Sequence, residues 1–193
     1  MTTFVALLRG INVSGQRRIA MVDLKLLLEG LGLEEVRTYV QSGNAVFGAS
    51  ADDPAGLASA IRGRIARDLG HDVAVLVLSA GDMARMAGSN PFLSLSGVDQ
   101  KWLHATFLFA KVSPSAFGAL DLPARQQEQA RLVDGVVYLS LPNGYGRTRL
   151  NNAYFEKALG TAATTRNWKT VRALADLSVQ RQGPGNAPSG AEW

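Results

Sequence analysis

Cations stand at the start of the last predicted helix, a place where most helices carry acidic residues. Arg166 and Lys169 fall in the first turn of a helix predicted over residues 166–177, together with Asn167 and Trp168. The amino-terminal end of a helix carries partial positive charge, so cations there are unfavourable unless an anion binds beside them. These residues therefore predict a phosphate or carboxylate site. The alternative is that Arg166 pairs with a distant carboxylate and Trp168 belongs to the core.

A second basic segment is the glycine-containing loop over residues 143–149, which carries Arg147 and Arg149. Glycines let backbone amides approach a ligand closely, and arginine binds phosphate through paired hydrogen bonds. The spacing matches neither the P-loop nor the dinucleotide fingerprint. Taken alone, the loop indicates an exposed turn with solvated arginines. Taken with Arg166 and Lys169, it predicts a shared anion site.

The loop over residues 9–18 offers a third set of polar donors. Arg9 ends a predicted buried strand, where a charge without a partner is costly, and Asn12 and Arg17 follow it. One interpretation is ligand binding by all three. The other is structural, with Arg9 bonding carbonyls and Asn12 in a left-handed turn.

Residues 36–47 predict a hairpin with a two-residue turn. In that register Gln41 lies opposite Asn44 and shares one sheet face with Tyr39. Such a face could stack a nucleotide base, as RNA-recognition sheets do, but those sheets use several aromatic residues. We therefore favour packing of this face against the second half of the chain, with Gln41 and Asn44 bonding across the interface.

The residues available for catalysis are few. His71 and His104 are the two histidines, and His104, in a predicted strand, is the one candidate general base. The chain has no cysteine, which excludes disulfides and thiol nucleophiles. No metal-binding spacing or nucleophile-elbow motif is present, so we expect no metal and no cofactor. Whether the protein is an enzyme stays open.

The composition is that of an ordinary globular protein with a small basic excess. The net charge of +4 comes from 20 Lys+Arg against 16 Asp+Glu, which permits an anionic partner without requiring one. No segment approaches the roughly 20 apolar residues of a membrane helix, and the apolar run near the start is too short for a signal peptide. We expect a cytoplasmic protein with no membrane partner.

The elements that must position these residues form a similar α+β pattern twice. The first half predicts the order βαββαβ, which is the ferredoxin-like arrangement, and the second half predicts βαββαα. We therefore predict an α+β fold of two ferredoxin-like subdomains packed together. The predicted parts are a first subdomain over residues 1–80, a connector over 81–100, a second subdomain over 101–178 and a disordered tail over 179–193.

Two predicted strands, residues 4–8 and 73–78, are apolar without alternation. Such strands are buried on both faces, whereas the helices of a single ferredoxin-like unit cover only one. Something must cover the second face. The second half of the chain is the economical candidate, and the partner in a homodimer is the next.

Four segments then resemble a known family. They are LLRGINVSG at residues 7–15, TYVQSGNAVF at 38–47, NPF at 90–92 and TTRNWKTV at 164–171. Together they resemble domain of unknown function 1697, in order and over residues 3–177. The resemblance implies a bacterial protein of two α+β subdomains, with no settled activity and no catalytic residue to carry over. Lys169 stands where members usually have asparagine, which adds a charge.

Our leading hypothesis is binding of a phosphate-bearing ligand, either a nucleotide or a nucleic acid backbone, at a basic site between the subdomains. One alternative is an enzyme that uses the same cations with His104 as a proton donor or acceptor. The other is an interaction module that packs against a partner chain. The candidate binding residues are Arg9, Asn12, Arg17, Gln41, Asn44, Arg147, Arg149, Arg166, Asn167, Trp168 and Lys169.

Overall fold

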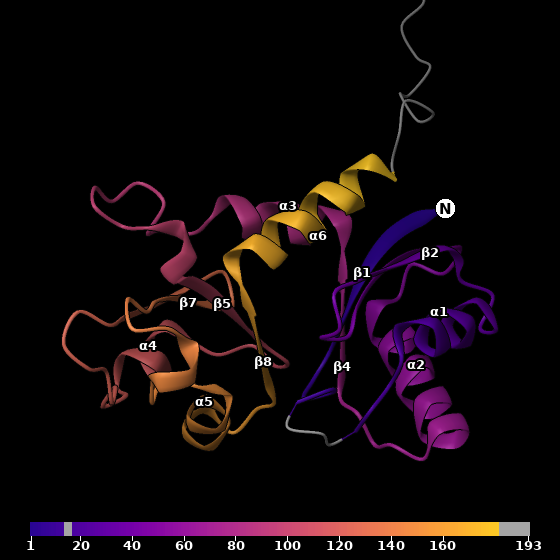
Figure 1. The fold of residues 1–193 in the computed structure, drawn as a ribbon, viewed down its shortest axis with the longest axis horizontal. Coiled ribbons are helices and arrows are strands. Elements are labelled where there is room, and N and C mark those ends of the chain that lie inside the picture. The colour runs from indigo at the N-terminus through magenta and orange to yellow at the C-terminus, as the bar shows by residue number, and fades with distance from the viewer. Residues whose placement is uncertain (14–16, 182–193) are drawn as a thin grey trace, which may run out of the picture.

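Two four-stranded antiparallel sheets, each with its own helices, make up the protein (Figure 1). The structure is a computed structural model that describes residues 1–13 and 17–181. It confirms the α+β class and the pair of ferredoxin-like subdomains. In chain order the elements are β1 (Thr2–Leu8), α1 (Met21–Glu29), β2 (Glu34–Tyr39), β3 (Asn44–Ala49), α2 (Pro54–Leu69), β4 (Val75–Ser79), α3 (Ala80–Gly88), η1 (Gln100–Trp102), β5 (Leu103–Leu108), α4 (Pro114–Gly118), β6 (Gln129–Val133), β7 (Val136–Ser140), η2 (Tyr145–Arg147), α5 (Asn152–Leu159), β8 (Ala163–Asn167) and α6 (Trp168–Gln180).

The two halves have the same topology. The strand orders are β2-β3-β1-β4 and β6-β7-β5-β8, and each βαββαβ unit is followed by one further helix, α3 or α6. The predicted order βαββαα for the second half is wrong, because β8 was missed. Its residues pair antiparallel with β5, with Arg166 opposite Ala105, so they are a strand and not the start of a helix.

Helix α2 begins and ends at the predicted residues, and the predicted turn between β6 and β7 is present. The side chain of Asp53 accepts a hydrogen bond from the Ala55 N–H before α2, and Gly70 ends that helix in the left-handed conformation. Asp134 and Gly135 have φ values of 50° and 80°, as the predicted tight turn between β6 and β7 requires.

The hairpin of β2 and β3 differs from its predicted register by two positions. Tyr39, not Gln41, lies opposite Asn44, and the connection contains four residues. The chain leaves the ladder at Val40, which takes a left-handed φ of 49°. A shift of two positions leaves each side chain on its predicted face, so Tyr39 and Asn44 still point away from α1 and α2.

Strand β1 is buried on both faces, as predicted. Phe4 and Leu8 pack in a cluster with α1 and α2, whereas Val5 and Leu7 pack in a central cluster that contains Phe107 of the second sheet. In Figure 1, α3 and α6 lie across the junction of the two halves. The second half of the same chain therefore covers the second face of β1. A third apolar cluster lies on the outer face of the second sheet, against α5.

Helix α6 continues to Gln180, two residues into the predicted tail, and residues 182–193 lie outside the described residues. Within residues 1–13 and 17–181, no helix has the length and apolar character needed to cross a membrane.

Substitution of Val40 by glycine is expected to stabilise the protein. The left-handed backbone costs a β-branched residue roughly 1–3 kcal/mol, and the greater chain entropy of glycine offsets roughly 0.5–1 kcal/mol of the gain. We expect the free energy of unfolding to rise by about 1 kcal/mol, measured by urea denaturation. The control is Val22→Gly in α1, an exposed valine whose replacement should lower it by about 0.5 kcal/mol. A loss of stability in Val40→Gly would contradict this account.

Candidate functional site

Arg166 is a buried structural residue. Its side chain lies on the face of β8 that meets the first half, and the residue is 6% exposed. The guanidinium donates to Asn44 Oδ1 at 2.5 Å, to the carbonyls of Leu8 and Ser42 at 2.8 and 3.1 Å, and to Thr164 Oγ1 and the Thr165 carbonyl at 2.7 and 3.0 Å. These contacts, called here the Arg166 cluster, occupy all five N–H donors of the group. Arg166 therefore has no donor left for a ligand.

No carboxylate belongs to the Arg166 cluster. Burial in this neutral setting lowers the pKa of Arg166 to about 10, although Tyr145 acts weakly in the opposite direction. The guanidinium remains charged at neutral pH. The suggestion that Arg166 pairs with a distant acid is therefore wrong, because oxygen dipoles of neutral groups take the place of an acid.

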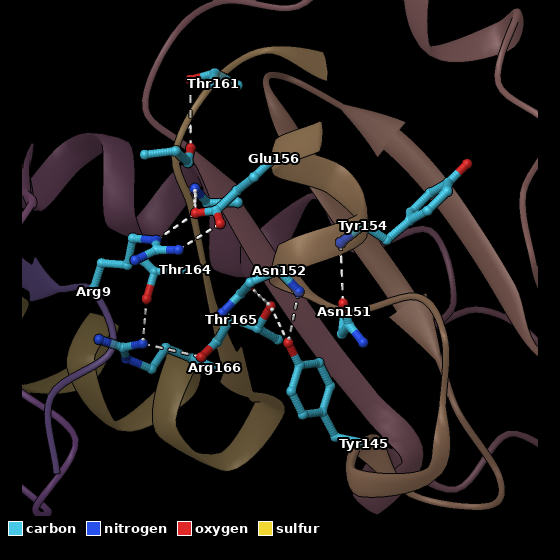
Figure 2. Close-up of polar contacts among 12 residues, drawn as sticks. Arg9, Tyr145, Asn151, Asn152, Tyr154, Glu156, Thr161, Thr164, Thr165 and Arg166 are labelled. Atoms are coloured by element: carbon cyan, nitrogen blue, oxygen red, sulfur yellow. Dashed lines mark hydrogen bonds and ion pairs between the residues drawn. The ribbon is translucent and has the colours of Figure 1, made fainter. Parts of the chain in front are cut away.

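Arg9 makes the second polar link between the halves. Its guanidinium donates two hydrogen bonds to the carboxylate of Glu156 in α5, as Figure 2 shows. Glu156 also accepts from the Ala163 N–H at 2.9 Å. Burial alone would raise the pKa of Glu156, but the hydrogen bonds from Arg9 and Ala163 outweigh it and hold that pKa below its ordinary value. Arg9 is thus neutralised within the protein.

Asn12 holds the first-half loop closed. It takes a left-handed φ of 54°, and its side chain bonds the backbone of Ile19 in both directions and the carbonyl of Gln41. The structural interpretation of Asn12 agrees with this geometry. The Gln41 side chain makes no bond across the interface in the described residues, in contrast to Asn44. Arg17 is exposed, and its carbonyl accepts from the Asn12 N–H at 3.3 Å.

A hydroxyl network anchors the glycine-containing loop beside α5 (Figure 2). Tyr145 donates to Thr165 Oγ1 at 3.2 Å and accepts from the Asn152 N–H, while Thr165 donates to Asn152 Oδ1 at 2.6 Å. Arg147 and Arg149 are exposed on the same loop. They do not border the cavities described below, so they do not join Lys169 in one site.

His104 lies on the opposite face of the second sheet from Arg166. It pairs with Asn167 across the ladder, whereas Arg166 pairs with the next residue, Ala105. Its ring stacks on Tyr145 with centroids 5.4 Å apart, and Nδ1 donates to the Trp102 carbonyl at 3.1 Å. Burial lowers the pKa of His104, and this hydrogen bond opposes the shift only in part. The enzyme hypothesis needs His104 and Arg166 in one site, and the structure places them on opposite faces of the sheet.

The true start of α6 lies two residues after the predicted one. Asn167 is its cap and accepts from the Thr170 N–H at 2.8 Å. Trp168 is 2% exposed in the central apolar cluster, and its indole Nε1 has no hydrogen-bond partner among the described residues. Lys169 is exposed in the first turn. The predicted pairing of a helix start with cations therefore holds for Lys169 and not for Arg166.

A cavity of about 620 Å³ lies beside this helix start, and we call it the N-terminal cavity. Tyr39 at the end of β2, Lys101 in η1, and Lys169 and Arg172 in α6 border it, and Asp176 is its one acidic residue. Arg172 donates to Gln100 Oε1 at 3.2 Å, and Lys101 pairs with Asp99 at 2.9 Å on the surface. In the part of the chain that the structure describes, Lys169 and Arg172 make no ion pair.

This arrangement can hold an anion. The first N–H groups of a helix lack partners within it, and their partial positive charge adds to that of nearby cations. Of the predicted binding residues, Asn167, Trp168 and Lys169 border this cavity. Sequence reasoning placed Tyr39 on a sheet face that could stack a base, but it missed Lys101 and Arg172, because the cavity forms only when β2, η1 and α6 meet. In residues 1–13 and 17–181, no group of three or more acidic or histidine side chains is placed to hold a metal ion.

Comparison with known proteins gives a family and a fold. The family model described as Protein of unknown function (DUF1697) matches residues 1–138. The structure of conserved bacterial protein SP0830 from Streptococcus pneumoniae matches with a TM-score of 0.72 and 23% sequence identity, over 92% of this chain and 98% of that chain. At this identity the likeness concerns the fold alone. No curated protein matches the chain.

Replacement of Arg166 by methionine is expected to lower the free energy of unfolding by about 3–5 kcal/mol, because it leaves several buried oxygens without donors. Arg166→Lys should recover only part of this, since an ammonium has three donors. Urea denaturation measures both. Arg147→Met is the control, with an expected change within about 0.5 kcal/mol for an exposed side chain. A loss below 1 kcal/mol in Arg166→Met would refute the structural role.

The Arg9–Glu156 pair predicts a specific pH dependence. Since its folded pKa lies below the ordinary value of 4.5, ionised Glu156 stabilises the fold above that pH, and the contribution is lost as the pH falls through the folded pKa. Glu156→Gln should cost about 1–2 kcal/mol at pH 7 and less at about pH 3, measured by urea denaturation. The control, Glu29→Gln at an exposed pair with Lys25, should change little at either pH. An equal cost at both pH values would contradict the prediction.

Proposed function

The chain belongs to the DUF1697 family, whose description assigns no activity, and from its geometry we propose that the protein binds a phosphate-bearing ligand in the N-terminal cavity. The observation that supports this proposal is the convergence of Lys101, Lys169 and Arg172 on a cavity that also borders the start of α6. Two carboxylates oppose these three cations: Asp176 borders the cavity, and Asp99 pairs with Lys101 outside its lining. The local charge therefore favours an anion.

The size of the cavity supports a small ligand. Pockets for small molecules usually measure roughly 300–1,000 Å³, and this one is about 620 Å³. A nucleic acid backbone would instead need cations along an extended track. Arg17, Arg147 and Arg149 are exposed but do not border this cavity. We therefore favour a single phosphate-bearing molecule over a polymer.

The cations of the cavity differ in what they already bind. Lys169 is exposed and has no ion-pair partner among the described residues, and Arg172 makes one hydrogen bond, to a neutral amide. A phosphate would gain charge-assisted hydrogen bonds from both without breaking an ion pair. Lys101 would have to exchange Asp99 for the ligand, but an exposed ion pair contributes little free energy. Binding should weaken at high salt, because these heads lie near solvent.

The test is calorimetric titration of the full chain with pyrophosphate and with adenosine monophosphate at low and high salt. We expect Lys169→Gln with Arg172→Gln to weaken binding at least tenfold, since two of the three cations are removed. The matched control is Arg147→Gln with Arg149→Gln, which removes the same charge from an exposed loop and should change the affinity less than twofold.

Two outcomes would contradict the proposal. One is the absence of binding by both compounds at low salt. The other is an equal loss in the two double variants, because it would mean that net charge alone attracts the anion. Binding of single-stranded nucleic acid that depends on Arg147 and Arg149 but not on Lys169 would place the function elsewhere.

A further inference from the structure

A second cavity adjoins the first along α6. It measures about 770 Å³ and lies between α3 and the carboxy-terminal half of α6, and we call it the C-terminal cavity. Trp168, Gln100, Arg172 and Asp176 border both cavities. The two spaces therefore meet beside these shared residues, and together they follow α6 from its start to its end.

The two cavities differ in chemistry. Away from the shared residues, the N-terminal cavity carries the ammonium groups of Lys101 and Lys169, whereas the described residues add no further charged side chain to the C-terminal cavity. Its wall consists mainly of Ala84, Ala87, Gly88, Leu93, Ala175 and Val179. One end of the combined space suits an anion and the other suits an apolar group.

Leu93 and Val179 make the apolar end unusual. Their exposed fractions are 42% and 54%, and both border the C-terminal cavity. Single exposed apolar residues are common on proteins and carry no meaning, but exposed apolar residues that face one hollow indicate a binding surface. A ligand that covered both side chains would remove their apolar surface from water.

The shared residues suit a ligand that passes from one cavity to the other. Among the described residues, the guanidinium of Arg172 makes one hydrogen bond, to the neutral amide of Gln100 at 3.2 Å, so an anionic head could displace that amide.

From this combination we infer that the ligand is an anionic amphiphile with one alkyl chain. Its phosphate or carboxylate head lies in the N-terminal cavity, beside Lys169 and Arg172, and its chain lies in the C-terminal cavity, against Leu93 and Val179. Lys169 and Val179 are about 15 Å apart along the helix axis, which is comparable to the length of octyl phosphate. This inference rests on the proposed function and specifies the ligand of that same site.

The test is calorimetric titration of the full chain with ethyl, butyl, hexyl and octyl phosphate, all below their micellar concentrations. A methylene group that is fully buried contributes a factor of about four in affinity. With partial burial, we expect octyl phosphate to bind at least 30-fold more tightly than ethyl phosphate. Octanol, which lacks the charge, should bind far more weakly than octyl phosphate. Titration with octanoate compares the affinity for a carboxylate head with that for a phosphate head.

Two double variants test where the alkyl chain of the ligand lies. Leu93→Gln with Val179→Gln should abolish most of the gain with chain length and leave the affinity for ethyl phosphate unchanged. Both residues are exposed, so the variant should fold. The matched control, Val22→Gln with Leu26→Gln, makes the same chemical change at two exposed positions of α1 and should keep the full gain.

The outcomes separate the two proposals. Equal affinities along the series, with sensitivity to Lys169→Gln and Arg172→Gln, would overturn the amphiphile and leave the phosphate site intact. A gain with chain length that survives Leu93→Gln with Val179→Gln would also overturn it. Binding of no phosphate compound at all would remove the proposed function itself.

Discussion

The fold depends on one guanidinium, that of Arg166, which ties the two ferredoxin-like halves together. A buried charge is costly unless its donors are satisfied, and here five oxygen acceptors surround it with no carboxylate among them. Leu8, Ser42 and Asn44 supply acceptors from the first half, and Thr164 and Thr165 supply them from the second. Arginine suits this position because its planar group presents five donors in fixed directions, which an ammonium cannot do. Around it, apolar residues of β1 and β3 from the first sheet, of β5 and β7 from the second, and of α3 and α6 form the central cluster.

The Arg166 cluster also explains which segments of the sequence carry the family resemblance. Three of the four segments meet at this one group: residues 7–15 provide the Leu8 carbonyl, residues 38–47 provide Ser42 and Asn44, and residues 164–171 provide Arg166 itself. The fourth, at residues 90–92, places Phe92 in the central cluster. These segments therefore hold the subdomains together, and two of them also supply Tyr39, Asn167 and Lys169 to the border of the N-terminal cavity.

The sequence predicted well those features that depend on neighbouring residues. The caps of α2 and the tight turn after β6 follow from single residues with specific backbone preferences. Strand β8 was missed because Thr164, Thr165 and Arg166 show no apolar alternation, and they become a strand only by pairing with the edge of β5. The role of Arg166 was hidden for the same reason, since its acceptor Leu8 lies 158 positions away in sequence. From the sequence, Lys101 and Arg172 are ordinary surface charges, because no residue near them in sequence indicates a cavity between η1 and α6.

The cations of this protein can be sorted by how many of their donors the protein already uses. Arg166 uses all of its five, and the charge of Arg9 is matched by that of Glu156. Arg172 uses one, on a neutral amide, and Lys169 lies exposed in the first turn of α6. Because β8 leads directly into α6, the Arg166 cluster that fixes the strand also fixes where that first turn stands. The fully bonded arginine thus positions the incompletely bonded cations beside the cavity, where unused donors and a helix start face the same space.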